Sequence, residues 1–412
     1  MRATQGTRTV EAFSVHGKRG LRPGPVLCVM TLVQVLATSS VLALTALAPQ
    51  VAADLAVGAH WIGYQVSLVY LAGMLTSATA GEIGARLGPE RMLVLVLALL
   101  AAGLALLAQG AVPAMGLGTV LIGLAYGLNN PAASELLARV TPLRRRGLVF
   151  SVKQAGVPLG AILASLGLPP LTLLLGGQWQ ATLIVVAGLT LGTLALLPLV
   201  LGLPPRPVAV LAGGGLGRMW AQQRQLWRDP TQRALAAIGG LYSAVQLIVT
   251  AFAVVTLVDL GWSVVEAGAA AALIHVAGVV ARPAWGMVAD KVGAFAVLTL
   301  LGVLIFVMVG GLAALPVMPR PLQAVWYLAL GLAVTGWNGV MLAATAQSAP
   351  HGTVGARTGA VLVWTFIGVT LGPALFALLT TAIGDSRPAF GLISVAGLVG
   401  AALALGCIRK QG

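Results

Sequence analysis

The sequence predicts an all-α, polytopic membrane protein in which twelve transmembrane helices form two pseudo-symmetric six-helix bundles. Of its 412 residues, 58% are hydrophobic and only 8% are charged. A soluble domain carries about 25% charged residues, so this composition excludes an ordinary soluble enzyme. Two further observations predict the fold: apolar segments of bilayer-spanning length, and a repeat that relates the two halves of the chain.

A membrane-spanning helix needs about 20 mostly apolar residues. The sequence contains twelve such segments, at residues 26–48, 60–81, 92–110, 114–138, 147–168, 179–201, 234–258, 265–288, 294–315, 322–346, 358–382 and 389–408. The first apolar segment is longer than the roughly 7–15 residues of a signal-peptide core, so we interpret it as a retained helix.

The basic residues predict how the spans are oriented. There are 24 Lys and Arg residues against 10 Asp and Glu, which gives a net charge of +14. With both termini cytoplasmic, 20 of the basic residues lie in cytoplasmic segments, only Arg320 and Arg387 lie outside, and Lys153 and Arg282 lie within spans. The positive-inside rule favours this arrangement. We expect a bacterial-type inner-membrane protein that binds no nucleic acid.

A polar segment rich in glycine, proline and arginine separates the sixth span from the seventh. It predicts five regions: a cytoplasmic tail 1–25, a first bundle 26–203, a cytoplasmic linker 204–232, a second bundle 233–408 and a cytoplasmic tail 409–412.

The two predicted bundles repeat each other. Matching positions recur in the same order along both halves, including Gln34 with Gln246, Asn130 with Asn338, Gly156 with Gly368, and Gly81 with Gly286. Two six-helix halves of this kind are typical of secondary transporters, whose substrate site lies between the halves near mid-membrane.

The loops after the second and eighth spans carry related motifs. The second copy reads Gly-Met-Val-Ala-Asp-Lys-Val-Gly at 286–293, and the first reads Gly-Glu-Ile-Gly-Ala-Arg-Leu-Gly at 81–88. They resemble the signature loop of the major facilitator superfamily, and the resemblance covers essentially the whole chain. The first copy departs from the signature at Ala85, where the family has Asp.

The resemblance implies the major facilitator fold and a cytoplasmic latch built from these loops. Since Ala85 replaces the acid of the first copy, we expect Glu135 to pair with Arg86 instead. The predicted gating and latch residues are Gly81, Arg86, Gly88, Glu135, Gly286, Asp290, Lys291 and Gly293.

Two cations are predicted to lie at similar depth in different halves. Lys153 is seven residues past Arg146, about 10 Å along a helix, and Arg282 is eight residues before Asp290, about 12 Å. Charged groups are costly at this depth, and no Asp or Glu is found at a matching position. The counter-charge is therefore expected to arrive with a small-molecule anionic substrate, a mono- or dicarboxylate. The alternatives are a snorkelling Lys153 and an Arg282 paired with a backbone carbonyl.

The segment 281–290 resembles the eighth span of monocarboxylate transporters and oxalate–formate exchangers, which implies that Arg282 binds a carboxylate. The sequence departs from both families. Gly278 stands where monocarboxylate transporters have an acid, and Thr365 stands at the repeat counterpart of Lys153, in the span where the exchangers carry their lysine.

His275 lies two helical turns before Arg282 on the same face, and it is the candidate for proton coupling. A helix-packing histidine is the alternative. Besides Arg282 and Lys153, the candidate substrate-binding residues are Gln34, Tyr70, Tyr126, Asn130, Gln246, Asn338 and Trp364. Polar side chains at such positions also bridge helices without touching a substrate.

These observations predict a secondary active transporter of a small organic anion that works by alternating access, as a monomer in the lipid bilayer. Its two cysteines and scattered histidines predict no metal site, and neither a cofactor nor an enzymatic activity is expected. Proton symport, exchange for a counter-anion and uniport all stay open. The alternatives are an efflux transporter for drugs or metabolites, and a transporter-fold receptor or scaffold without flux.

Overall fold

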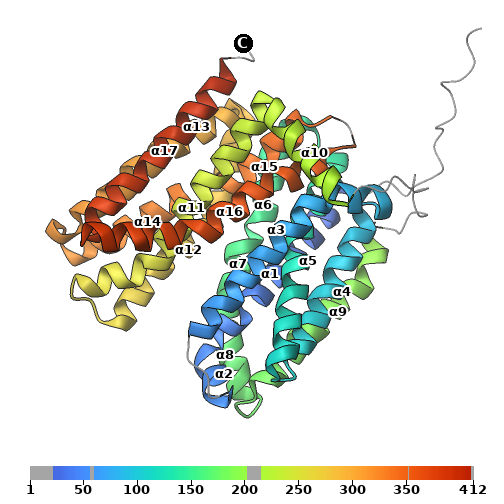
Figure 1. The fold of residues 1–412 in the computed structure, drawn as a ribbon, viewed down its shortest axis with the longest axis horizontal. Coiled ribbons are helices and arrows are strands. Elements are labelled where there is room, and N and C mark those ends of the chain that lie inside the picture. The colour runs from blue at the N-terminus through green and yellow to red at the C-terminus, as the bar shows by residue number, and fades with distance from the viewer. Residues whose placement is uncertain (1–21, 56–59, 202–214, 351, 410–412) are drawn as a thin grey trace, which may run out of the picture.

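The protein is described by a computed structural model covering residues 22–55, 60–201, 215–350 and 352–409, which are almost entirely helical (Figure 1). Twelve helical segments in this part of the chain are long and apolar enough to cross a membrane. Each coincides with one predicted span, with its ends shifted by a few residues. The predicted fold class is confirmed.

The first half begins at Pro23 and ends at Leu201. Its elements are α1 (Pro23–Ala46), α2 (Ala48–Leu55), α3 (His60–Leu87), α4 (Pro89–Leu107), α5 (Val112–Val140), η1 (Leu143–Arg145), α6 (Arg146–Gln154), α7 (Gly156–Ile162), η2 (Leu163–Gly167), α8 (Leu168–Leu174) and α9 (Trp179–Leu201). The run from η1 to α8 is the fifth span, broken into short helical pieces.

The second half is preceded by a helix within the linker. The elements are α10 (Gly215–Arg228), α11 (Pro230–Asp259), α12 (Val264–Val292), α13 (Ala294–Gly310), η3 (Gly311–Val317), α14 (Arg320–Val334), α15 (Trp337–Ser348), α16 (Val354–Ile383) and α17 (Ser386–Ile408). The tenth span is divided into α14 and α15 at Thr335 and Gly336.

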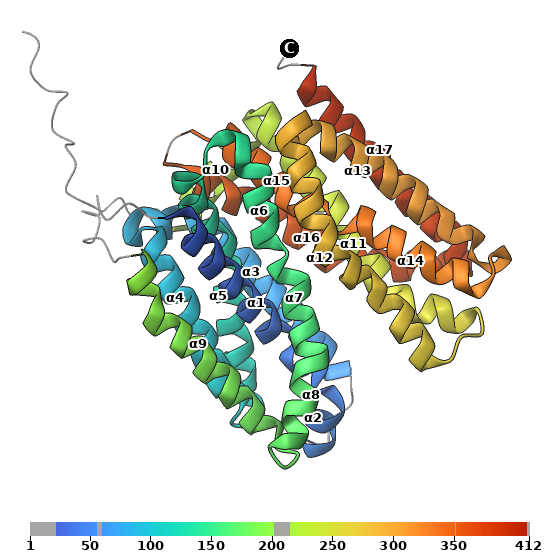
Figure 2. The same ribbon diagram turned by 180° about the vertical axis from the view of Figure 1, so that it is seen from behind.

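The halves meet through corresponding helices: α3 and α5 pack on α16, and α6 packs on α12 and α15. The two halves lie close together where α10 and the end of α17 are found, and their ribbons diverge toward α8 and α14 (Figures 1 and 2). The linker helix α10 contacts both α3 and α16, so it crosses from one half to the other.

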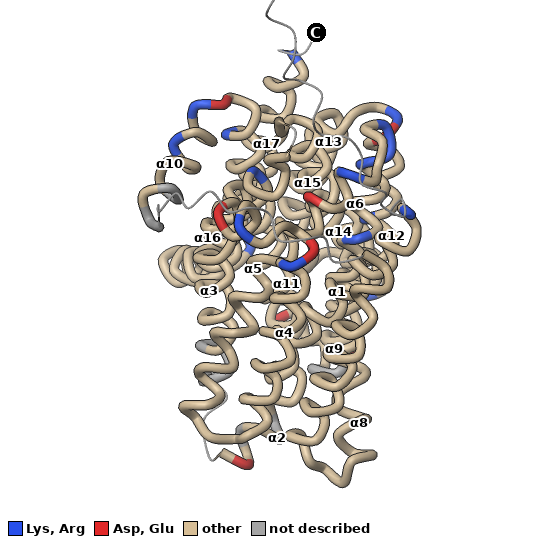
Figure 3. The backbone as a smooth tube through the Cα atoms, turned by 90° about the vertical axis from the view of Figure 1, so that its right-hand side faces the viewer, with Lys and Arg blue, Asp and Glu red and all other residues tan. Residues whose placement is uncertain are grey.

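Basic residues gather at the end where the halves are close, as the tube coloured by charge shows (Figure 3). We call this the basic end; it carries the ends of α3, α10, α12 and α17, with Arg86, Arg228, Lys291 and Arg409. Arg320 is the first residue of α14 and Arg387 is the second residue of α17, and both lie at the opposite end of the molecule from the basic end. Among the described residues the charges segregate as the sequence predicts; most of the predicted N-terminal tail, part of the linker and the end of the C-terminal tail lie outside them.

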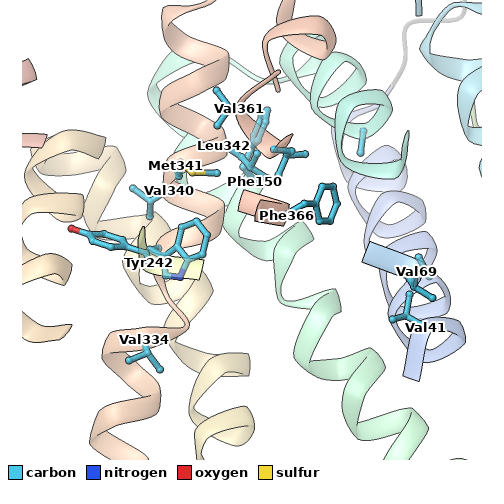
Figure 4. Packing of buried hydrophobic residues seen from close by; sticks show 14 of the residues in the cluster. Val41, Val69, Phe150, Tyr242, Val334, Val340, Met341, Leu342, Val361 and Phe366 are labelled. Atoms are coloured by element: carbon cyan, nitrogen blue, oxygen red, sulfur yellow. The ribbon is translucent and has the colours of Figure 1, made fainter. Parts of the chain in front are cut away.

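Glycines allow the helices of the core to touch. A Cβ added to Gly127 would lie 2.1 Å from the Gly73 carbonyl oxygen, and one on Gly368 would lie 2.1 Å from that of Gly240. Around these contacts, large side chains such as Tyr242 and Phe150 fill the interior (Figure 4). The Tyr242 hydroxyl donates to the Leu298 carbonyl at 2.9 Å, which satisfies its buried polar atom.

Candidate functional site

Lys153 lies at the end of α6, and its side chain is 2% exposed. Its ammonium group donates to Gln34 Oε1 at 2.5 Å, to Gln154 Oε1 at 3.2 Å and to Asn130 Oδ1. An ammonium has three N–H donors, so these three neutral amides satisfy it fully. The Lys153 side chain is therefore held inside the protein without snorkelling to the surface, and no carboxylate of the described residues forms a salt bridge with it.

Arg282, in the middle of α12, is 3% exposed. Its Nη1 donates to the main-chain carbonyl of Gln154 at 2.7 Å, and its Nε has no hydrogen-bond partner among the described residues. The Gln154 carbonyl is available because the residue four positions later is Pro158, which has no N–H to donate. The pairing with a backbone carbonyl, one of the sequence-based alternatives, is therefore present and uses only part of the guanidinium.

Gln154 connects the two cations and the two halves, and it is not among the residues predicted from the sequence. Its side-chain nitrogen donates to Asn338 Oδ1 at the start of α15, across the interface between halves. The signal that could have identified it was Pro158, which predicts a free carbonyl at position 154 within a span that already carries a buried lysine.

A cavity of about 110 Å³ lies between the halves at this level. It is lined by six of the predicted residues, namely Tyr70, Tyr126, Asn130, Gln246, Arg282 and Asn338, and by residues that were not selected, including Gln154, Trp337, Thr365 and Phe366. A larger groove of about 310 Å³ at the basic end is mostly apolar and lies between α10, α11 and α17. Of these two, the central cavity is the one lined by polar groups from both halves, so it is the better candidate.

Four predicted residues lie outside the lining of the central cavity, and Lys153, described above, is one of them. Gln34 is fully buried behind it, where its oxygen accepts from Lys153 and from Asn129. Trp364 instead packs beneath α10, with its Nε1 donating to Gln223 Oε1 at 3.0 Å and its ring against Trp227. The prediction that Trp364 lines the cavity is wrong, because its helix face turns to the linker. His275 is exposed and is not among the lining residues.

Asp290 closes the basic end. Its Oδ1 accepts from the Gly147 N–H at 2.7 Å and its Oδ2 from the Leu148 N–H at 2.9 Å, at the start of α6 in the other half. These N–H groups belong to the first turn of a helix and have no intrahelical partner, so a carboxylate there is stabilised by hydrogen bonds and by the helix dipole. Gly286 lies one turn earlier, where a Cβ would meet Ser151.

Glu135 makes the corresponding contact for the other half. Its Oε2 accepts from the Gly355 N–H at 2.8 Å, in the first turn of α16. The predicted pairing of Glu135 with Arg86 is wrong: Arg86 pairs with Glu82 one turn earlier on its own helix, and Glu135 lies 3.4 Å from Arg139. Glu135 is therefore held by a free N–H group of α16 and by Arg139 of its own helix, and not by Arg86.

The remaining predicted latch residues shape the loops. Gly88 and Gly293 have φ values of 73° and 94°, a left-handed backbone that only glycine adopts without strain, and each begins the helix that follows. A Cβ on Gly81 would lie 2.7 Å from the Ala356 Cβ, so this glycine permits contact between halves. Lys291 is exposed beside the Asp290 contact.

No group of His, Cys, Asp and Glu suited to a metal ion occurs among the described residues. Arg282 thus lines the central cavity with its Nε unpartnered among the described residues, and Asp290 and Glu135 join the two halves at the basic end.

Comparisons with known proteins agree with this architecture. The chain is 30% identical over 129 residues to the uncharacterised transporter YycB of Bacillus subtilis, covering 31% of this chain and 32% of that protein. It is 30% identical over 214 residues to an uncharacterised MFS-type transporter of Mycobacterium tuberculosis, covering 50% of this chain and 45% of that protein. The matched part of the chain spans less than half the length of these relatives.

Three solved structures share the fold. The human organic anion transporter MFSD10 has a TM-score of 0.76 at 15% identity and covers 93% of this chain and 99% of its own. The Escherichia coli fucose:proton symporter FucP has a TM-score of 0.72 at 15% identity and covers 92% and 97%. A structure of FucP in the outward conformation has a TM-score of 0.75 at 14% identity, with the same coverage.

The model of the Major Facilitator Superfamily matches residues 27–360. Because that match covers well over half of the sequence, and twelve described helical segments are long and apolar enough to cross a membrane, the chain belongs to the major facilitator superfamily of multi-pass membrane proteins.

Proposed function

We propose that this transporter carries a small organic anion by alternating access and that Arg282 binds the anionic group. The observation that carries the proposal is the buried guanidinium of Arg282, which lines the cavity between the halves with its Nε unpartnered among the described residues. The described residues that line the cavity include no Asp or Glu. A carboxylate would satisfy the guanidinium through charge-assisted hydrogen bonds, whereas a cation would be repelled.

Lys153 lies next to the proposed anion site and contacts residues that line it. The sequence suggested direct binding of the substrate by both cations, but the Lys153 ammonium is satisfied by three amide oxygens and does not line the cavity. We therefore propose that it positions Asn130 and Gln154, two lining residues, and adds a positive potential that favours an anion. In this account, Lys153 is a positioning residue and Arg282 is the contact.

The orientation follows from charge. We propose that the basic end is cytoplasmic and that the membrane is a bacterial-type inner membrane, as the positive-inside rule favours. Asp290 and Glu135 then hold the cytoplasmic side closed, and the cavity is reached from the outside. The fold is also that of FucP in its outward conformation and of a human protein named an organic anion transporter.

The transport cycle that we propose is driven by ion or substrate gradients. Opening the cytoplasmic side requires Asp290 to leave the start of α6 and Glu135 to leave the start of α16, after which the halves rock around the bound anion. His275 is the candidate for proton coupling because it lies two turns from Arg282 and is exposed.

Uptake of radiolabelled carboxylates into proteoliposomes tests the proposal. We expect uptake by the wild type, loss of uptake in Arg282→Ala, and wild-type rates in Arg387→Ala, which removes an exposed arginine at the opposite end. Retained uptake in Arg282→Ala would refute the anion site. Saturable binding without flux would favour a receptor, and transport of organic cations alone would favour drug efflux.

A further inference from the structure

The lining of the central cavity offers an anion a single positive charge. Among its described lining residues, Arg282 is the sole charged side chain, and all three donors of Lys153 are already taken by amide oxygens. A second carboxylate on the same molecule would have to lose its hydration without gaining a cation. Burying an unpaired carboxylate is strongly unfavourable, so the cavity disfavours a dianion.

One wall of the cavity is made of aromatic rings. Tyr70 from α3 and Tyr126 from α5 lie edge to face, with ring centroids 6.1 Å apart, and Phe366 from α16 is 6.2 Å from both. All three line the cavity, the two tyrosines are half-buried, and Phe366 is 4% exposed behind them. Rings at such spacing accept a further ring in an offset or edge-to-face arrangement.

The ring wall also joins the halves. Tyr70 and Tyr126 belong to the first half and Phe366 to the second, whereas Arg282 belongs to the second half and donates to Gln154 of the first. A ligand that touches Arg282 at one end and the rings of Tyr70 and Tyr126 at the other would therefore contact both halves, which is what a substrate must do to couple binding to their movement.

We propose that the substrate is an aromatic monocarboxylate, with its carboxylate on Arg282 and its ring against Tyr70 and Tyr126. This inference rests on the proposed anion transport and narrows the substrate class from mono- or dicarboxylates to monoanions with a flat, unsaturated body.

Equilibrium binding to the purified full-length protein tests this inference with four probes that isolate each feature. Benzoate carries the ring and one charge, cyclohexanecarboxylate lacks the π system, succinate carries a second charge, and benzamide lacks the charge. We expect benzoate to bind about 2- to 12-fold more tightly than cyclohexanecarboxylate, which is the affinity ratio that corresponds to the interaction energy of one aromatic pair. Succinate and benzamide should bind more weakly than either.

Two variants of Tyr70 distinguish an effect of its aromatic ring on binding from an effect on folding. Tyr70→Leu should bring the benzoate and cyclohexanecarboxylate affinities together, and Tyr70→Phe, which keeps the ring, should restore the preference. Phe252→Leu is the matched control, because Phe252 packs edge to face on Phe376, with ring centroids 4.8 Å apart within the second half, and does not line the cavity.

The outcomes distinguish this inference from the function on which it rests. Succinate binding more tightly than benzoate, or no preference between benzoate and cyclohexanecarboxylate, would overturn the aromatic monoanion while leaving an Arg282-dependent anion carrier intact. No binding of benzoate at millimolar concentration would overturn it as well. Benzamide binding as tightly as benzoate, in both wild type and Arg282→Ala, would instead refute anion recognition itself.

Discussion

Gln154 and Asn338 are hydrogen-bonded to each other across the interface between the two halves, with the Gln154 side-chain nitrogen as donor. The same Gln154 accepts from Lys153 through its side chain at 3.2 Å and from Arg282 through its carbonyl at 2.7 Å. One residue thus touches both buried cations and the opposite half. Any movement of Arg282 on binding an anion is therefore transmitted directly to a contact that holds the halves together.

Gln154→Leu removes that link while keeping a similar volume. The change leaves the Asn338 oxygen and one Lys153 donor without partners, and an unsatisfied buried polar group costs about 1–3 kcal/mol. We expect a lower melting temperature together with a smaller loss of anion affinity than in Arg282→Ala, because the main-chain contact to Arg282 persists. Thermal unfolding and equilibrium binding measure the two effects.

Gln180→Leu serves as the control for that prediction. Gln180 donates to Asp54 at 2.9 Å in an exposed contact at the opposite end of the first half. Exposed hydrogen bonds contribute little to stability, so its melting temperature should stay near that of the wild type. Equal melting temperatures for the two variants would contradict the role assigned to Gln154.

Glu135→Ala should weaken the closure of the basic end. The variant loses a carboxylate that caps the first turn of α16, and such a cap contributes about 0.5–2 kcal/mol. We expect longer distances between spin labels placed at Arg144 and Lys291, on the two halves, in a background without Cys28 and Cys407. Pulsed electron paramagnetic resonance measures this distribution.

Ala85→Asp should restore closure in the Glu135→Ala background. Position 85 lies one turn after Gly81, which contacts Ala356 in the first turn of α16, so an acid there can reach the same free N–H groups. Glu82→Ala, which removes the Arg86 pair within one helix, should leave the distances unchanged. Failure of Ala85→Asp to shorten them would show that Glu135 does not replace the missing signature acid.

Lys153→Met tests whether Lys153 positions its neighbours or contacts the substrate. The methionine removes the Lys153 donor from the oxygens of Asn130 and Gln154 and leaves Gln34 Oε1 with Asn129 as its donor, so we expect a marked loss of thermal stability. Because Arg282 remains, anion affinity should fall less than in Arg282→Ala. A loss of affinity equal to that of Arg282→Ala, with unchanged melting, would instead make Lys153 a direct ligand.

The twelve spans were predictable because bilayer thickness fixes the length of an apolar segment, and the halves were predictable because the repeat preserves Gln34 with Gln246 and Asn130 with Asn338. The burial of Lys153 and Arg282 was predictable from their depth in a span. Asp290 was identified through the family signature, and the structure places it against α6.

The partners of these residues were harder to predict, because they depend on which helix faces turn toward each other. Trp364 faces the linker helix α10, and the pattern of apolar spans does not predict where that helix lies. Glu135 contacts α16 because the start of that helix presents free N–H groups. Gln154 acts largely through its main-chain carbonyl, which side-chain chemistry does not indicate. Only Pro158, four residues later, signals that this carbonyl is free.

The most direct test of the central claim is the binding of one carboxylate and its neutral amide to wild type and Arg282→Ala. Hydrogen bonds to charged groups contribute about 1.5–3 kcal/mol, so the wild type should bind benzoate at least about 10-fold more tightly than Arg282→Ala does. Benzamide should bind both proteins equally weakly. If benzoate binds Arg282→Ala as tightly as it binds the wild type, Arg282 does not hold the anion and the account is wrong.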